Sequence, residues 1–243
     1  MPYLRSAILF IAILSTFIYT KGQKTTFSKW LTVISDFKLY GQISFHFDAQ
    51  VKINPELKHL QGLLLRPAII FRVKNNMAAA LGYALIENRR AVGTVNGYAP
   101  EQDIWEQLQF TNMPGFILLT NRFRLEQRFI SNSVLQENAF HTENYVFANR
   151  FRYFVKGLFP LNGQRKFEKG YYADLQNEIF INIGDKSNVN GKFFDQNRAA
   201  FGFGYRFNRK LDGELGYLNQ YISGRNAAFT NNHIIQLTAY IRL

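Results

Sequence analysis

One tetrapeptide, Asn-Arg-Phe-Arg, occurs twice in the chain and constrains its fold more than any other feature. The copies span residues 121–124 and 149–152. After the first copy, the alternation continues with a charged row of Arg122, Arg124, Glu126 and Arg128 and an apolar row of Phe123, Leu125 and Phe129. A helix would scatter these charges around its circumference, whereas a strand separates the two rows onto opposite faces. The pattern therefore predicts strands with one strongly apolar face that something must cover.

Alternating segments of the same kind follow one another from residue 27 to the C-terminus. The clearest is 42–53, in which every odd-numbered residue is apolar and every even-numbered residue is polar. We count eleven such segments if 27–35 is included. Single-chain bacterial barrels have even strand numbers, so the place of 27–35 stays open. Residues 103–111 alternate less regularly because Glu106 shares a face with apolar residues, which a bulge or a nearby strand end would explain.

The connections between these segments alternate in length. Short ones are expected at 74–76, 112–115, 160–163 and 208–210, and longer polar ones at 88–101, 131–144, 184–192 and 223–232. This order is typical of an up-and-down antiparallel meander with short turns at one end and long loops at the other. No linker or change in composition divides it. We therefore expect one domain, residues 23–243.

The N-terminus has the features of an export signal. One basic residue, Arg5, precedes an apolar run at 6–19, and the polar residues 20–23 follow it. This run of roughly 14 residues is shorter than the ~20 that a spanning helix needs. Residues 1–22 are therefore expected to be a signal peptide that takes the chain out of the cytoplasm. The chain has no cysteine, which excludes disulfides and thiolate metal sites.

Two architectures accept this alternation. A soluble sandwich or barrel hides the apolar row inside, whereas an outer-membrane barrel turns that row to lipid and the charged row to its interior. The segments are long enough to cross a bilayer, which takes about 9–11 tilted residues. An arginine facing lipid at the midplane costs about 2–4 kcal/mol, so the arginine rows must face inward. The sequence predicts an all-β, up-and-down antiparallel transmembrane barrel of about ten to twelve strands.

Several ordered motifs resemble a known family. They are NRFRLEQRF at 121–129, NRFRY at 149–153 followed by Pro160, NEIFINIG at 177–184, and the strongest, FDQNRAAFGFGYRFNRKLDGELGYLNQY, at 194–221. Together they resemble the DUF2490 family of uncharacterised outer-membrane proteins. The resemblance spans most of the mature chain and implies a β-barrel in the outer membrane of Gram-negative bacteria. It implies no activity. The chain departs from the family pattern near Trp105, which an arginine commonly precedes.

The inward rows form the candidate functional site. The residues expected in this interior charge network are Arg66, Arg72, Arg122, Arg124, Glu126, Arg128, Arg150, Arg152, Glu178, Arg198 and Arg206. One interpretation is a narrow pore that prefers anions, since rings of arginine or lysine do so. The other is a structural role, in which cross-strand ion pairs fill a small barrel and fix its register. Both interpretations stay open at this point.

A lipid-modifying hydrolase is the alternative from another class. Ser44, His46 and Asp48 share one face at a spacing of two, which resembles a nucleophile, a base and its orienting acid. Neighbours on one strand face are roughly 6–7 Å apart, however, which is long for a relay. The face also points away from lipid. An enzyme built around His46 or His141 is therefore the weaker hypothesis, and we expect no enzymatic role.

The remaining expectations concern cofactors and partners. The four histidines lack metal-ligand spacing to one another, and no phosphate-binding loop is present, so no cofactor or metal is expected. The net charge of +12 is spread along strands and is not gathered on one helix, which argues against nucleic acid. The expected partners are outer-membrane lipid and lipopolysaccharide, with the barrel-assembly machinery during insertion. We expect a monomer.

Overall fold

Eleven strands form the whole of the regular structure in the described part of the chain. The structure is a computed structural model that describes residues 23–164 and 166–243. The signal peptide expected at 1–22 lies outside the described residues. The strands are β1 (Gln23–Tyr40), β2 (Ile43–Ile53), β3 (Leu60–Lys74), β4 (Met77–Val92), β5 (Val95–Asn112), β6 (Leu118–Gln136), β7 (Ala139–Pro160), β8 (Gly170–Ile183), β9 (Phe194–Asn208), β10 (Leu211–Ser223) and β11 (Phe229–Arg242). Within those two ranges, no helix is long and apolar enough to cross a membrane.

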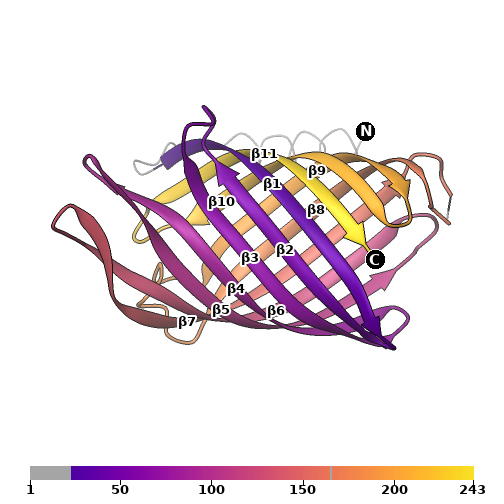
Figure 1. The fold of residues 1–243 in the computed structure, drawn as a ribbon, viewed down its shortest axis with the longest axis horizontal. Coiled ribbons are helices and arrows are strands. Elements are labelled where there is room, and N and C mark those ends of the chain that lie inside the picture. The colour runs from indigo at the N-terminus through magenta and orange to yellow at the C-terminus, as the bar shows by residue number, and fades with distance from the viewer. Residues whose placement is uncertain (1–22, 165) are drawn as a thin grey trace, which may run out of the picture.

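The strands close into one barrel, which confirms the predicted all-β architecture (Figure 1). Each strand pairs antiparallel with its neighbour in sequence. Only the closing pair differs, because β1 runs parallel to β11 from Gln23 opposite Phe229 to Asp36 opposite Arg242. In a meander with an odd number of strands, the first and last must point the same way. The segment 27–35 therefore belongs to the barrel, as part of β1.

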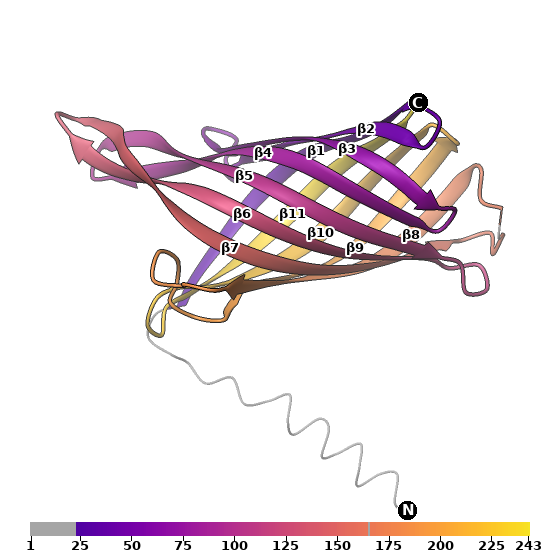
Figure 2. The ribbon, with the colours of Figure 1, turned by 90° about the horizontal axis from the view of Figure 1, so that it is seen from below.

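The long-loop end is built differently from the sequence prediction. The expected polar loops at 88–101 and 131–144 are mostly strand, so β4–β5 and β6–β7 form extended hairpins with turns at 93–94 and 137–138. Glu137 and Asn138 both have positive φ, 47° and 64°, as a tight two-residue hairpin turn requires. Figure 2 shows the β6–β7 hairpin reaching beyond the other strand ends. These strand segments carry polar residues on both faces. Without an apolar row, the sequence shows no strand alternation there.

At the short-turn end, one connection is longer than expected. The turn predicted at 160–163 is part of a connection that spans 161–169, from the end of β7 to the start of β8. Residue 165 within it is not described. Arg209, in the β9–β10 turn, donates a hydrogen bond to Glu168 and joins the two connections. This contact lowers the pKa of the exposed Glu168 carboxyl.

The two rows of each strand face opposite sides of the barrel wall. Along β6, Phe123 and Leu125 expose 38% and 37% of their surface, whereas Arg124 and Glu126 expose 2% and 1%. The arginines therefore face the interior and the aromatic row faces outward. Large apolar residues form an outward-facing belt around the barrel, which includes Phe27, Leu31, Leu81, Ile104, Leu125, Leu175, Phe201, Phe203, Leu215, Ile235 and Leu237.

Glu106 is an exception within this belt. It lies on β5 between Leu81 of β4 and Leu125 of β6, and its side chain is exposed. Neither ladder has a register shift here, so the bulge considered for residues 103–111 is wrong, and Glu106 is well inside β5. Gln127 donates a hydrogen bond of 3.1 Å to its carboxylate. The alternation is therefore regular, and this position of the outer face carries an acid.

Candidate functional site

Glu126 is the centre of the buried charge network inside the barrel. It lies opposite Arg150 in the β6–β7 ladder, and its Oε2 is 2.6 Å from Nη2 of Arg150. Its Oε1 is 2.5 Å from Nη1 of Arg152 and 3.9 Å from Nη1 of Arg124. One carboxylate thus meets three guanidinium groups. All four side chains are buried, and all four come from the two strands that carry the repeated tetrapeptide.

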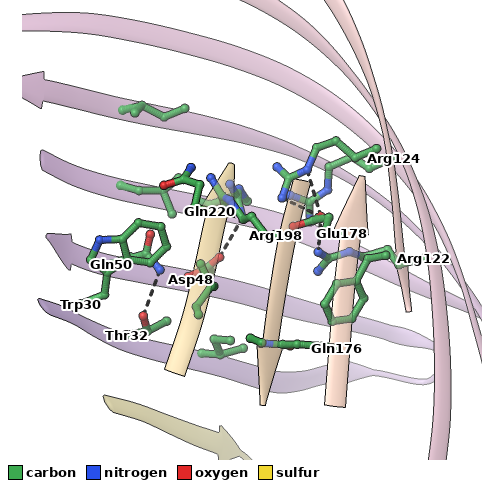
Figure 3. Close-up of a pocket in the computed structure, with 18 of the residues that line it drawn as sticks. Trp30, Thr32, Asp48, Gln50, Arg122, Arg124, Gln176, Glu178, Arg198 and Gln220 are labelled. Atoms are coloured by element: carbon green, nitrogen blue, oxygen red, sulfur yellow. Dashed lines mark hydrogen bonds and ion pairs between the residues drawn. The ribbon is translucent and has the colours of Figure 1, made fainter. Parts of the chain in front are cut away.

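Arg152 connects this centre to a second acid. Its Nη2 lies 2.8 Å from Oε1 of Glu178 on β8, and Nη2 of Arg122 lies 2.8 Å from the same oxygen. Arg122, Glu178 and Arg124 are labelled at one side of the cavity in Figure 3. Because Arg152 bridges two carboxylates, the network joins β6, β7 and β8. Charge-assisted contacts of this kind hold the strands in register.

Further ion pairs extend the network around the wall. Arg66 on β3 pairs with Asp48 on β2 at 2.9 Å. Arg128 on β6 pairs with Glu101 on β5 at 2.7 Å. Arg150 also reaches Asp195 on β9 at 3.2 Å. The pairs join neighbouring strands or span the interior, so their geometry depends on the closed barrel.

Aromatic rings support several of the guanidinium groups. Arg124 lies 4.0 Å from the ring centroid of Trp105, and Arg152 lies 4.4 Å from that of Phe180. Trp105 fits because Gly82 is its cross-strand partner, and a Cβ on Gly82 would approach the indole to 2.3 Å. Strand alternation does not predict this aromatic layer, because the inward row is expected to be polar. Gly82, at the inward position opposite Trp105, was the available signal.

The network borders a cavity of about 630 Å³ inside the barrel (Figure 3). Of the described residues that line it, nine are lysine or arginine and five are aspartate or glutamate. The residues predicted from sequence that line it are Arg66, Arg122, Arg124, Arg128, Arg150, Arg152, Glu178 and Arg198. Lysines were missed, and Lys52 and Lys156 belong to the wall. Both lie on inward rows, so strand alternation could have found them.

Three predicted residues lie elsewhere. Glu126 is buried in the network and does not line the cavity. Arg72 is exposed near the end of β3, and no side-chain partner for it is found among the described residues, so it is not part of the network. Arg206 holds Asp212 through two hydrogen bonds of 2.9 Å near the short-turn end. Arg242 donates to the same aspartate, which ties β9, β10 and β11 together there.

A second cavity of about 200 Å³ lies next to the first, towards the short-turn end. The two share four lining residues, Ile34, Asp36, Lys156 and Tyr240. Lys156 donates hydrogen bonds of 3.0 Å to Glu214 and to Tyr240, and its Nζ lies 3.3 Å from Asp174. These shared side chains form a constriction between the cavities.

The residues of the hydrolase hypothesis are not brought together. Nδ1 of His46 lies 2.7 Å from Asp36 on β1, and Asp48 pairs with Arg66. In the described part of the chain, Ser44 makes no hydrogen bond to His46. His141 lies on the exposed β6–β7 hairpin. Among the described residues, neither His46 nor His141 makes a side-chain hydrogen bond to a hydroxyl group.

No metal site is found in residues 23–164 and 166–243, where no three histidine, aspartate or glutamate side chains are grouped to hold an ion. Most interior carboxylates instead pair with arginines or lysines, whereas Asp36 lies 2.7 Å from His46 and the buried Asp103 has no ion pair among the described residues. Chemically, the arrangement is a set of buried charge-assisted contacts that surround a cavity.

Comparison with known proteins agrees with the motifs. The chain is 24% identical over 204 residues to an uncharacterized protein of Methylorubrum extorquens, which covers 83% of this chain and 82% of that protein. Among solved structures, the chain is similar to the NanC porin. The two are 10% identical, the TM-score is 0.46, and the match covers 80% of this chain and 84% of the porin chain. The model of the family described as protein of unknown function (DUF2490) matches residues 27–231. Because this match covers most of the chain, the protein belongs to the DUF2490 family.

Proposed function

We propose that the protein is an outer-membrane barrel with a narrow interior path that favours anions. The observation that carries this proposal is the composition of the cavity wall, with nine cationic and five acidic side chains. A wall with this excess attracts anions and repels cations, and low-dielectric surroundings strengthen the effect. That the chain is a barrel of the DUF2490 family rests on the fold and on the family match.

The outward belt supports the membrane location. Phe201, Phe203, Leu215 and Leu237 each expose more than half of their surface on consecutive strands. A contiguous apolar surface of this kind is rare on soluble monomers and fits a lipid environment. The inward position of the arginines fits as well. If these rows faced outward, several arginines would lie in lipid at a cost of about 2–4 kcal/mol each at the midplane. The polar hairpins at the long-loop end would then lie outside the bilayer, next to lipopolysaccharide.

The constriction supports a narrow path. Lys156 pairs with Asp174 and Glu214 and donates a hydrogen bond to Tyr240 where the two cavities adjoin, and seven of the described arginines line the larger cavity. A solute must pass these side chains or move them. The same dense pairing favours a second candidate, a closed scaffold whose network only fixes strand register.

Planar-bilayer recording separates the two candidates. Purified protein is inserted under a potassium chloride gradient, and the reversal potential is measured. The proposal predicts small, discrete conductances with a reversal potential shifted towards the equilibrium potential of chloride. An absence of conductance would favour the scaffold, and cation selectivity would overturn the anion path. Membrane fractionation with heat-modifiable gel migration tests the location, and recovery of soluble protein would contradict it.

A further inference from the structure

Trp30 on β1 holds two cations over one ring. Lys52 lies directly opposite it in the β1–β2 ladder, and the Lys52 Nζ is 5.2 Å from the ring centroid. The guanidinium carbon of Arg198, on β9, is 5.5 Å from the same centroid. Contacts at these distances attract a cation to the ring but leave its charge in place. Two positive groups therefore meet at one part of the cavity wall.

Neither cation has an acidic partner in the described part of the chain. Lys52 and Arg198 make no ion pair or hydrogen bond there, and Arg198 Nε is buried without an acceptor. Glu178, opposite Arg198 in the β8–β9 ladder, instead accepts from Arg122 and Arg152. The other cations lining the cavity each pair with an acid: Arg66, Arg122, Arg124, Arg128, Arg150, Arg152 and Lys156. The two exceptions are the two that meet at Trp30.

Two positive groups share the Trp30 ring, and cations outnumber acids, nine to five, among the described residues that line the cavity. A charge held away from bulk water without a counter-ion is strongly destabilising. Both side chains line the cavity and are partly exposed to it, so a solute inside the barrel can reach them. Two cations without acidic partners are suited to an anion, since charge-assisted contacts to an oxyanion are strong.

We propose that Lys52, Arg198 and Trp30 form a binding site for a small carboxylate- or phosphate-bearing anion. The cavity of about 630 Å³ has the size of a small-molecule site. The two cations would hold the oxyanion, and the indole offers an apolar face to the rest of the molecule. Gln220, opposite Arg198 in the β9–β10 ladder, and Gln50 on β2 line the same space and provide uncharged amides (Figure 3). The inference rests on the proposed function in one respect, that solutes reach the interior.

Equilibrium binding tests the site directly. Inorganic phosphate and citrate are titrated separately into the purified barrel in detergent, followed by calorimetry and by tryptophan fluorescence. We expect saturable binding of at least one probe, and the comparison tells phosphate from carboxylate recognition. Lys52→Gln and Arg198→Gln should each weaken binding at least about tenfold, because each removes a charge-assisted contact. Lys58→Gln, an equal charge change in the exposed 54–59 loop, should leave binding unchanged.

A fourth variant covers the case in which loss of a cation disturbs folding. Gln220→Glu keeps both cations and places a carboxylate beside Arg198. It should abolish binding of both probes and raise the thermal midpoint, because it supplies the missing counter-ion from within. No saturable binding of phosphate or citrate to the wild type, or wild-type affinity in all three cavity variants, would overturn the site.

The binding and conductance measurements can contradict the binding site and the pore independently. A barrel that binds a probe through Lys52 and Arg198 but carries no current would refute the pore and leave the site intact. Anion-selective current without saturable binding would support the pore and refute the site. The two measurements use the same purified protein, so neither result depends on a different preparation.

Discussion

Nη1 of Arg152 lies 2.5 Å from Oε1 of Glu126, and both side chains are almost fully buried inside the barrel. Arg150 holds the other oxygen of the same carboxylate. One glutamate therefore compensates guanidinium groups from both copies of the tetrapeptide, since Arg124 is also near it. The repeat does not form a basic patch open to a partner; it forms the two walls of a shared ion cluster.

The first prediction removes this acid. Glu126→Gln leaves Arg150 and Arg152 without their common counter-ion, and breaking a buried pair in this way costs about 3–5 kcal/mol. The midpoint of urea unfolding, followed by heat-modifiable gel migration, should fall sharply. Glu56→Gln, in the exposed 54–59 loop, should leave the midpoint unchanged. An unchanged midpoint in Glu126→Gln would show that the cluster does not stabilise the barrel.

A second prediction concerns the close packing of Tyr172 against β9. A Cβ on Gly204 would come within 2.3 Å of the phenol ring of Tyr172, which is fully buried. Gly204→Ala should therefore destabilise the barrel by about 1–3 kcal/mol, the usual cost of overpacking. Gly213→Ala on β10 is the matched control, because its nearest neighbour would be at 3.5 Å. Equal unfolding midpoints for the two variants would contradict the packing argument.

Strand alternation made most of the fold predictable. The period of two places Arg124 and Glu126 on one side of the wall and Phe123 and Leu125 on the other, and the energy of burying charge in lipid decides which side faces in. The closing strand was harder to assign. In β1, the inward row includes the apolar Trp30, so its pattern does not separate polar from apolar residues.

The sequence predicts most of the residues of the site but not which acid each arginine contacts. Sequence alone indicates that arginines face the interior, yet which acid each one meets depends on cross-strand register and on distances across the barrel. Arg152 reaches Glu178 because β7 and β8 are adjacent at that level. Arg198 remains unpaired for the same kind of reason, since its neighbouring acid is already engaged. A list of inward charges cannot show this difference.

A third prediction addresses selectivity at the constriction. Lys156→Gln removes a cation and leaves Asp174 and Glu214 to dominate the passage between the cavities. The reversal potential should move towards that of potassium under the same salt gradient, because the local charge becomes negative. Lys210→Gln, an exposed residue in the β9–β10 turn at the same end, should leave it unchanged. A shift towards chloride in Lys156→Gln would contradict a path through this constriction.

The last prediction tests the outward-facing belt through Glu106, the acidic exception described above. Glu106 is exposed on the outer face between Leu81 and Leu125. If lipid covers this face, a carboxyl group is unfavourable there. Glu106→Leu should then stabilise the barrel in lipid vesicles by roughly 1–2 kcal/mol. This gain is smaller than the cost of a basic residue at the bilayer midplane. The gain arises because leucine removes the cost of burying a carboxyl in hydrocarbon and extends the apolar contact with the bilayer. Glu143→Leu, on the exposed β6–β7 hairpin, should give no gain, since water surrounds that position. Urea midpoints in vesicles measure both variants, and a loss of stability in Glu106→Leu would mean that something other than lipid covers this face.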